Sequence, residues 1–180
     1  MNKEIVLEAV DNYNPLNNTD AAFQRQILDF LQRCDEFWQR STFEGHITGS
    51  AWICSPDFQR TLLIHHIKLD RWLQPGGHVE GTDAEPGETA EREAREECFL
   101  TVLNRLQAGI FDLDVHLIPA KNGVPEHLHY DLRYLFVTPE ILHEFDALEV
   151  KGMQWVPIRD LCGDDTPESL RRMALRTLAL

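Results

Sequence analysis

The chain has 180 residues, of which 43% are hydrophobic and 26% charged, as in an ordinary globular domain. Its formal net charge of −13 argues against general binding to nucleic-acid polymers or anionic membranes, although a nucleotide could enter with its own Mg²⁺. The four cysteines form no CxxC pair, the N-terminus lacks a signal-peptide pattern, and no apolar run reaches membrane-spanning length, so we expect a cytoplasmic protein.

The first two segments differ in pattern. Residues 1–18 are rich in asparagine and are expected to form an irregular or partly extended arm. Residues 19–39 are predicted to form a helix, because apolar side chains recur there at helical spacing. These side chains are Phe23, Ile27, Phe30, Leu31, Cys34, Phe37 and Trp38. We interpret the segment as a helix packed on a sheet; a dimer contact or a substrate lid is the alternative.

A hairpin is predicted next. Residues 45–55 and 60–68 each form a strand candidate, and Ser55-Pro56-Asp57 between them is typical of a turn. His65 and His66 then fall on opposite faces of the second strand. One of them could face a site, but a lone strand histidine is more often structural.

The most informative stretch runs from Trp72 to Leu100 and begins with a Pro-Gly-Gly turn. Its last 24 residues carry eight acidic and two basic side chains. A helix is predicted over 88–98, with Glu93, Glu96 and Glu97 on one face. Like charges on one face repel, and a hard divalent cation such as Mg²⁺, which prefers oxygen ligands, would relieve that repulsion. The alternative is a solvated acidic helix.

This stretch resembles the Nudix box, G-x5-E-x7-R-E-U-x-E-E-x-G-U, in which U is a bulky aliphatic residue. Gly77 matches the leading glycine, Arg92-Glu93 the R-E pair, and Glu96-Glu97 the paired glutamates, while Leu100 matches the last aliphatic position. The resemblance implies the Nudix fold, of the α/β (α+β) class, with a mixed central β-sheet between helices. We expect this fold to cover residues of about 44–163, within a single domain that comprises residues 1–180.

The match has two departures. The segment from Gly77 to Arg92 is one residue longer than the pattern, which places an insertion within 81–88 and leaves Asp83 and Glu85 competing for the early glutamate. Phe99 replaces the glycine that would end the helix in the left-handed conformation, so we expect the helix to end otherwise or to continue.

The resemblance also implies site residues. Glu93, Glu96 and Glu97 would hold Mg²⁺ or Mn²⁺, Gly77 would add its backbone carbonyl, and Arg92 would orient the glutamates. Glu93 is the first candidate for the general base, and the outside candidates are Glu126, Asp131 and Glu144.

The strand predicted over 126–136 has a second chemical pattern. Its apolar face carries Leu128, Tyr130, Leu132, Tyr134 and Phe136, and its polar face carries His127, His129, Asp131 and Arg133. We expect the polar face to line the cleft, where it could contact substrate together with Trp52 and Phe111. The alternatives are a His-x-His-x-Asp site for a transition metal and simple hydrogen bonding within the sheet.

The chain then has three more predicted elements. Before the polar strand, Phe111, Leu113 and Val115 alternate with Asp112, Asp114 and His116 in another strand. After it come a short helix or turn over 139–144 and a last strand over 150–156. A terminal helix over 166–178 is expected to be capped by Thr166 and to carry an apolar stripe of Leu170, Met173, Leu175 and Leu178.

The resemblance therefore implies a Mg²⁺-dependent pyrophosphohydrolase that cleaves a diphosphate bond in a nucleoside diphosphate linked to another moiety. One alternative is a nucleotide-sensing binding module without turnover. The other is a Nudix-fold prenyl diphosphate isomerase, a class that uses a catalytic cysteine and histidine ligands and usually lacks an intact R-E-x-x-E-E. Nudix domains often dimerise, so a homodimer is allowed, although no stretch identifies a dimer contact.

Overall fold

Strand β1 (Gly45–Cys54) lies at the centre of the sheet and is buried along its whole length. In this computed structural model, which describes residues 1–121, 123–139 and 144–180, β1 runs parallel to β7 (His127–Val137). Its other edge pairs antiparallel with β4 (Gly76–His78) and, at Cys54, with β2 (Arg60–His66). The predicted hairpin therefore meets only at its tip, because β4 takes the place of β2 along the middle of β1.

The remaining strands complete an eight-stranded mixed sheet in the described part of the chain. Strands β3 and β8 both pair with β2, and β5 and β6 both pair with β7, all antiparallel. Their bounds are Arg71–Leu73 (β3), Asn104–Arg105 (β5), Asp112–Ile118 (β6) and Val150–Pro157 (β8).

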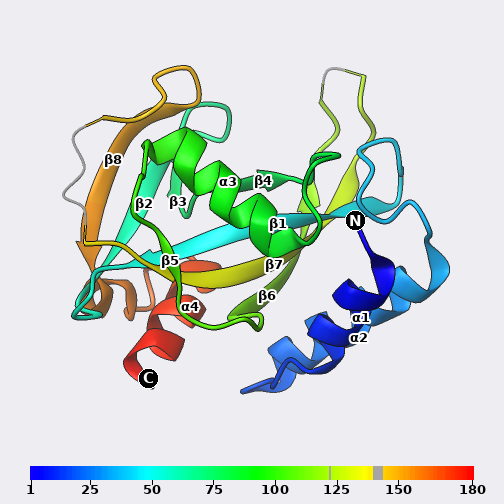
Figure 1. Cartoon of the computed structure of the whole chain (residues 1–180), viewed down its shortest axis with the longest axis horizontal. Coiled ribbons are helices and arrows are strands. Elements are labelled where there is room, and N and C mark those ends of the chain that lie inside the picture. Colours follow the sequence, from blue (N-terminus) through cyan, green and yellow to red (C-terminus); the bar gives the residue numbers. More distant parts are fainter. Residues whose placement is uncertain (122, 140–143) are drawn as a thin grey trace.

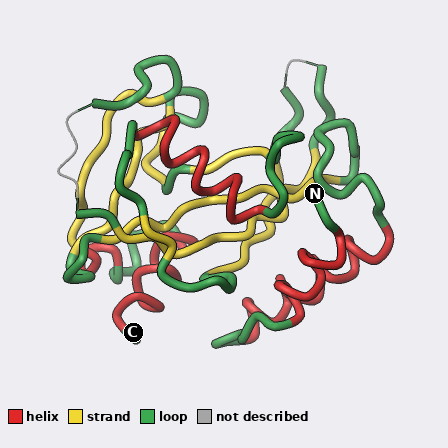
Figure 2. The backbone as a smooth tube through the Cα atoms, in the orientation of Figure 1, coloured by secondary structure: helices red, strands yellow, loops and turns green. Residues whose placement is uncertain are grey.

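Helices cover the sheet on both sides, as the α+β class requires (Figure 1). Helix α3 packs with α1 and α2 around the first core, while α4 and a 3-10 helix, η1, pack against the second. Figure 2 shows this arrangement of helices around the strands. The helices span Lys3–Asp11 (α1), Asn18–Arg33 (α2), Pro86–Cys98 (α3), Ile158–Leu161 (η1) and Glu168–Leu178 (α4). The predicted mixed sheet between helices is confirmed.

The alternation along β1 divides the interior into these two cores. Ile47, Ala51 and Ile53 point into the first core, and Trp52 and Cys54 point into the second, under α4. On that second side, the first half of β1 carries polar residues instead. The sheet face thus changes from a polar half to an apolar half along a single strand.

Trp52 and Phe111 both lie in the second core rather than on a surface open to substrate. The Trp52 ring is fully buried, and its Nε1 donates to Oγ1 of Thr177 at 2.8 Å. Packing, not substrate contact, explains both residues.

The N-terminal region differs from its prediction in two ways. The first segment forms a helix, α1, because Asn2 accepts a hydrogen bond from the N–H of Glu4 and the apolar side chains of Val6 and Val10 are buried against α2. Helix α2 ends at Arg33 instead of continuing to residue 39. The ring of Phe30 in α2 stacks on the ring of Tyr130 in β7, with 4.2 Å between the ring centres. This contact confirms the interpretation of the segment as a helix packed on the sheet.

The C-terminal helix α4 is present as predicted, but its cap and its buried residues differ from the prediction. Pro167, not Thr166, is its N-terminal cap residue, and no side chain caps it. The helix is rotated so that Leu175 and Leu178 are half exposed, and its buried residues are Leu170, Arg172, Met173, Ala174 and Thr177. The predicted short helix or turn over 139–144 falls largely outside the described residues.

Each helix of the described chain is too short or too polar to span a bilayer. The cytoplasmic location, the homodimer and the single-domain boundaries 1–180 stay predictions.

Candidate active site

Helix α3 turns its predicted acidic face away from the sheet, because the opposite face carries small side chains that pack closely against the strands. Ala90, Ala94 and Cys98 are completely buried against the sheet. Gly49 on β1 allows the close approach, since a Cβ there would lie 2.2 Å from the carbonyl oxygen of Pro86. The glutamates are thereby turned toward the cleft.

Arg92 connects the acidic side chains of this face. Its Nη1 donates to Oε1 of Glu93 at 3.0 Å and to Oε2 of Glu96 at 2.9 Å. Its Nη2 donates to Oδ2 of Asp83 at 3.1 Å and to the backbone carbonyl of His78 at 2.9 Å. A planar guanidinium can hold several acceptors in fixed directions, so Arg92 is placed to orient the glutamates.

Asp83 and Glu85, the two candidates for the early glutamate of the motif, have different partners in the structure. It is nearly buried and also accepts hydrogen bonds from Oγ1 of Thr89 and from the N–H of Glu80. Glu85 instead points to Arg105, with its Oε1 2.5 Å from Nη1. Asp83 is therefore the loop carboxylate that belongs to the Arg92 cluster.

Glu97 is the most deeply buried acid of the face, with 2% of its surface exposed. Its Oε2 accepts a hydrogen bond from the N–H of Gly76 at 3.1 Å, and no described Lys or Arg forms an ion pair with it. Burial, and then the nearby charge of Glu93, raise the pKa of Glu97 to about 8. Burial likewise raises the pKa of Glu93. Burial and mutual repulsion thus make the ionised forms of Glu93 and Glu97 unfavourable, and a cation bound between them would offset that cost.

Gly77 lies directly against Glu93. A Cβ at this position would be 2.4 Å from the Oε1 atom of Glu93, so only glycine leaves room for the carboxylate. The leading glycine of the motif therefore lies against the acidic face, and its role as a carbonyl ligand stays a prediction.

Two further groups approach Glu97 that sequence reasoning did not assign to the site. His66 of β2 and Glu149, which precedes β8, place ligand atoms within 4.8 Å of Glu97 and of each other. The sequence allows either His65 or His66 to face the site; in the structure it is His66, whereas His65 stacks on Trp72. The antiparallel pairing of β2 with β8 brings His66 and Glu149 together. Strand alternation alone could show only that one of the two histidines faces the site.

These residues border one large cleft of about 1520 Å³. Although the chain is acidic overall, the cleft is lined by four cationic side chains besides Arg92 and Arg133: Arg40, Lys68, Arg71 and Lys121. Of these, Arg40, Arg71 and Lys121 form no ion pair with another described residue. Trp72 also lines the cleft and is 39% exposed.

The polar face of β7 borders the same cleft, as predicted, but its two charged members are buried within the wall. Asp131 accepts hydrogen bonds from Thr48, from Ser50 and from Nε of Arg133, the last at 2.8 Å. Arg133 also pairs with Asp112 and Asp114 of β6. The alternative of hydrogen bonding within the sheet therefore describes these two residues best.

His127 and His129, the other members of that face, join a group of histidines. His46 of β1 lies 4.8 Å from His129 and 5.1 Å from His127, measured between ring centres. Asp131 is engaged elsewhere, so the His-x-His-x-Asp triplet does not converge on one point. The β1–β7 register adds His46 instead, which sequence spacing could not reveal.

The outside candidates for the general base are poorly placed. Glu126 and Glu144 do not line the cleft, and Asp131 is occupied by three donors. Glu149 lines the cleft and stands beside Glu97.

Phe99 ends α3 in the left-handed conformation, with φ of 49° and ψ of 33°. The expectation that a non-glycine residue would end the helix in another way is wrong. The backbone keeps the conformation that glycine would adopt there, and Glu93, Glu96 and Glu97 still line the cleft.

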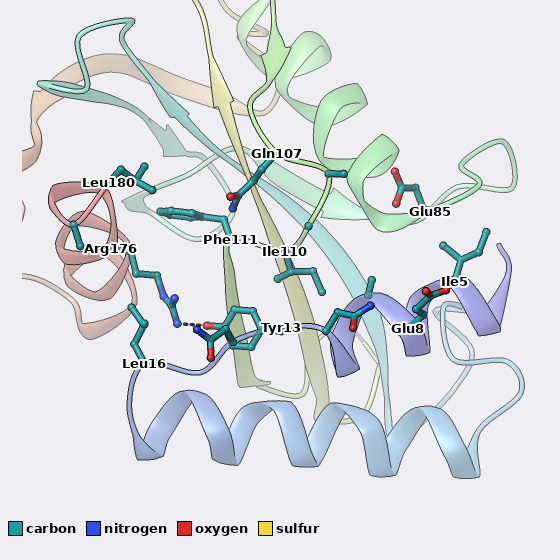
Figure 3. Close-up of a pocket in the computed structure, with 16 residues that line it drawn as sticks. Ile5, Glu8, Tyr13, Leu16, Glu85, Gln107, Ile110, Phe111, Arg176 and Leu180 are labelled. Atoms are coloured by element: carbon teal, nitrogen blue, oxygen red, sulfur yellow. Dashed lines mark hydrogen bonds between the residues drawn. The ribbon is translucent and has the colours of Figure 1, made fainter.

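A second hollow, of about 670 Å³, lies between the N-terminal segment and α4 (Figure 3). Arg176 bonds there to the hydroxyl of Tyr13, beside the apolar side chains of Ile110 and Phe111. Of the residues considered in the sequence analysis, Glu85 and Phe111 border this hollow, whereas the acidic face of α3 and the polar face of β7 border the large cleft, which is therefore the candidate active site.

A family model, that of the NUDIX domain, matches residues 46–176. The fold is similar to a NUDIX-family hydrolase from Clostridium perfringens, with 25% identity, a TM-score of 0.56, and coverage of 74% of this chain and 96% of that one. It is also similar to the dihydroneopterin triphosphate pyrophosphohydrolase of E. coli (17% identity, TM-score 0.55, 74% and 96% covered). A third similar structure is the NUDIX domain of Shewanella oneidensis NrtR complexed with ADP ribose (16% identity, TM-score 0.53, 83% and 97% covered).

At their identities, the second and third likenesses show the fold alone. No curated protein matches the sequence. Because the family match covers most of the chain and includes the acidic helix and its glycine turn, the chain belongs to the Nudix family, whose hydrolases act on acid anhydrides in phosphorus-containing substrates.

Proposed function

We propose that this protein is a Mg²⁺-dependent pyrophosphohydrolase, with Mn²⁺ as the alternative ion, and that its substrate is a nucleoside diphosphate linked to another moiety. The observation that carries the proposal is the deeply buried Glu97 beside Glu93, with no cationic side chain of the described chain paired to it. Unlike a solvated acidic helix, this arrangement repels itself unless a proton or a cation is present.

The donor set fits a hard divalent cation. Glu93, Glu96 and Glu97 offer carboxylate oxygens, and the backbone carbonyl of Gly77 is the further donor that we assign to the site. When bound, the ion would neutralise charge on the diphosphate oxygens and polarise the attacking water. Arg92 would hold the carboxylates of Glu93 and Glu96 in position through the whole reaction.

A base must also take a proton from the attacking water. Glu93 is one candidate, but its hydrogen bond to Arg92 and its role as a ligand both occupy it. We propose Glu149 as the second candidate, because it lines the cleft and lies beside Glu97. Lys68, whose Nζ donates to Oε1 of Glu149 at 3.2 Å, would help to hold that carboxylate in position.

The substrate class is inferred from the rim of the cleft. Arg40, Arg71 and Lys121 are exposed cations without ion-pair partners among the described residues, and phosphate groups would supply those partners. Trp72 offers an aromatic face on which a nucleobase could stack. A fold neighbour has been solved with ADP ribose, a molecule of the proposed class.

The test is release of phosphate or nucleoside monophosphate from a panel of nucleoside triphosphates, dinucleoside polyphosphates, ADP-sugars and NADH. Each assay is run with Mg²⁺, with Mn²⁺ and with EDTA. Turnover should require the ion and should collapse in Glu97→Gln. The matched control is Glu91→Gln on the same helix, which removes an acid paired with Arg95 outside the cleft and should retain activity.

Glu149→Gln separates the two base candidates. If Glu149 is the base, this substitution lowers kcat by roughly 10²- to 10⁴-fold and leaves KM nearly unchanged. If kcat is unchanged in Glu149→Gln, Glu93 becomes the preferred candidate for the general base.

Other outcomes would favour the alternatives. Thermal stabilisation by ADP ribose without any turnover would favour a binding module. Isomerisation of a prenyl diphosphate would favour the isomerase, but no cysteine among the described residues lines the cleft, and that class uses a catalytic one.

A further inference from the structure

Five histidine side chains gather on one wall of the cleft, although they are scattered in the sequence. They are His46 (β1), His78 (β4), His116 (β6), His127 and His129 (both β7). The sheet register creates the group: His46 and His116 lie directly opposite His129 on its two neighbouring strands. His78 has its ring centre 5.0 Å from those of both His46 and His129.

Several ring nitrogens in this group have no partner. His46 is 1% exposed, and neither of its nitrogens is hydrogen-bonded to any described residue. The Nε2 atom of His129 is also buried and unpaired among the described residues. Buried polar groups in proteins are almost always satisfied, so three unpaired nitrogens at one place indicate a missing ligand.

The geometry of three members suits a metal ion. Ligand nitrogens of His46, His127 and His129 all lie within 4.8 Å of one another. The Nδ1 atom of His127 is 2.9 Å from the carbonyl oxygen of Pro125. If Nδ1–H donates to that carbonyl, the lone pair of Nε2 is left free, which is the usual outer-shell arrangement of metal-binding histidines.

The protonation state is also suitable, because only a neutral imidazole can bind a metal. Burial lowers the pKa of His46 to about 4 and the pKa of His78 to about 3. Burial lowers the pKa of His129 as well. Burial thus favours the neutral form of these rings, which is the form that binds a metal.

We propose that His46, His127 and His129 form a binding site for a divalent transition metal ion, Zn²⁺ above all, that is separate from the carboxylate site on α3. Imidazole nitrogens suit Zn²⁺, Co²⁺ or Ni²⁺, whereas Mg²⁺ prefers oxygen. His78, whose ring centre lies 5.0 Å from those of both His46 and His129, is our candidate for a fourth position. His127 and His129 line the cleft, so the ion can reach the site from solvent. His116 is already held by Asp114 at 2.9 Å and is not included.

The test is a Co²⁺ titration of the full-length protein after treatment with a chelator, followed by displacement with Zn²⁺. Four-coordinate Co²⁺ bound by nitrogen absorbs visible light strongly, and this readout is independent of enzyme activity. We expect saturation at about one ion per chain, as for a single tetrahedral site. Mg²⁺ in excess should not displace the absorbing ion.

Variants assign the ion to the histidines. The Co²⁺ signal should persist in the double variant Glu93→Gln and Glu97→Gln. It should weaken in His129→Gln and in His127→Gln by at least the roughly 10- to 100-fold that loss of an outer-shell partner causes. The matched control is His65→Gln, a histidine that stacks on Trp72 and does not line the cleft. His127 is half-buried at the cleft rim, so its variant should fold even if His129→Gln does not.

Three results would overturn the proposal. One is the absence of a saturable signal in the wild-type protein. Another is a signal that disappears with the carboxylates and survives in folded His127→Gln. The third is an equal loss in His65→Gln, which would mean that binding is not specific to the cluster. None of these results depends on whether the protein hydrolyses a diphosphate.

Discussion

The backbone carbonyl of His78 accepts a hydrogen bond from Nη2 of Arg92 at 2.9 Å, while its imidazole ring lies beside those of His46 and His129. One residue therefore belongs to the carboxylate cluster through its main chain and to the histidine cluster through its side chain. Strand β4 has only three residues, Gly76 to His78, and all three contribute. Gly76 donates to Glu97, Gly77 leaves room for Glu93, and His78 joins the two clusters.

Gly77→Ala should displace the Glu93 carboxylate, because the new methyl group would lie 2.4 Å from its Oε1 atom. We expect Mg²⁺ affinity to fall by roughly 10- to 100-fold, the range for a disturbed ligand environment, with activity falling in parallel. Isothermal titration and activity assays at several Mg²⁺ concentrations measure this. Gly81→Ala is the matched control, since a Cβ there meets no atom within 4 Å. Equal effects of both substitutions would show that the contact with Glu93 is not the cause.

The stability of the metal-free protein should depend on the protonation of Glu97. Its pKa rises from an ordinary 4.5 to about 8 in the folded state, so the folded protein binds more protons than the unfolded chain between those values. Stability should therefore decrease as pH rises from about 5 through about 8. The measurement is the Tm in EDTA across this range.

Glu97→Gln is the matched variant for this pH series. It should flatten the pH dependence and raise the Tm above that of the wild-type protein at the alkaline end. Mg²⁺ should raise the Tm of the wild-type protein most at alkaline pH, because a deprotonated carboxylate binds the ion. An unchanged slope in Glu97→Gln would contradict this explanation.

Arg133 should be essential for folding rather than for substrate binding. It is 2% exposed and pairs with Asp112, Asp114 and Asp131. Arg133→Met removes the one described cation that pairs with the buried carboxylate of Asp131, whereas Asp112 and Asp114 keep Arg172. Removing one partner of a buried ion pair costs about 3–5 kcal/mol in comparable cases. Urea unfolding measures the loss. Lys3→Met removes an exposed pair with Asp35 and should change stability by less than about 1 kcal/mol. A stable Arg133→Met with a raised KM would restore its predicted role in substrate binding.

The local features of this protein were predictable from its sequence. The face of α3 that carries Glu93 and Glu97 follows from helical spacing, and the division of β7 into two faces follows from strand alternation. Both patterns are properties of a single element, and the adjacent residues determine them.

Features that depend on strand pairing were not predictable. Nothing in the sequence shows that His46 lies opposite His129, or that His66 and Glu149 meet across β2 and β8. Buried charge was also hidden, because the sequence of β7 gives Arg133 the appearance of a cleft residue. Its partners Asp112 and Asp114 come from β6. The acidic face of α3 is therefore predictable from the sequence, whereas its surroundings require the fold.

Phe99→Gly should stabilise the protein, because Phe99 adopts a left-handed backbone conformation that is unfavourable for residues with a Cβ atom and is tolerated by glycine. The ring is 52% exposed, so little packing is lost when it is removed. We expect a gain of about 0.5–1 kcal/mol in the free energy of unfolding, measured with urea. Phe99→Ala removes the same ring but keeps the positive φ, and it should give no gain. If Phe99→Ala and Phe99→Gly have equal stability, the backbone conformation at the end of α3 is not strained.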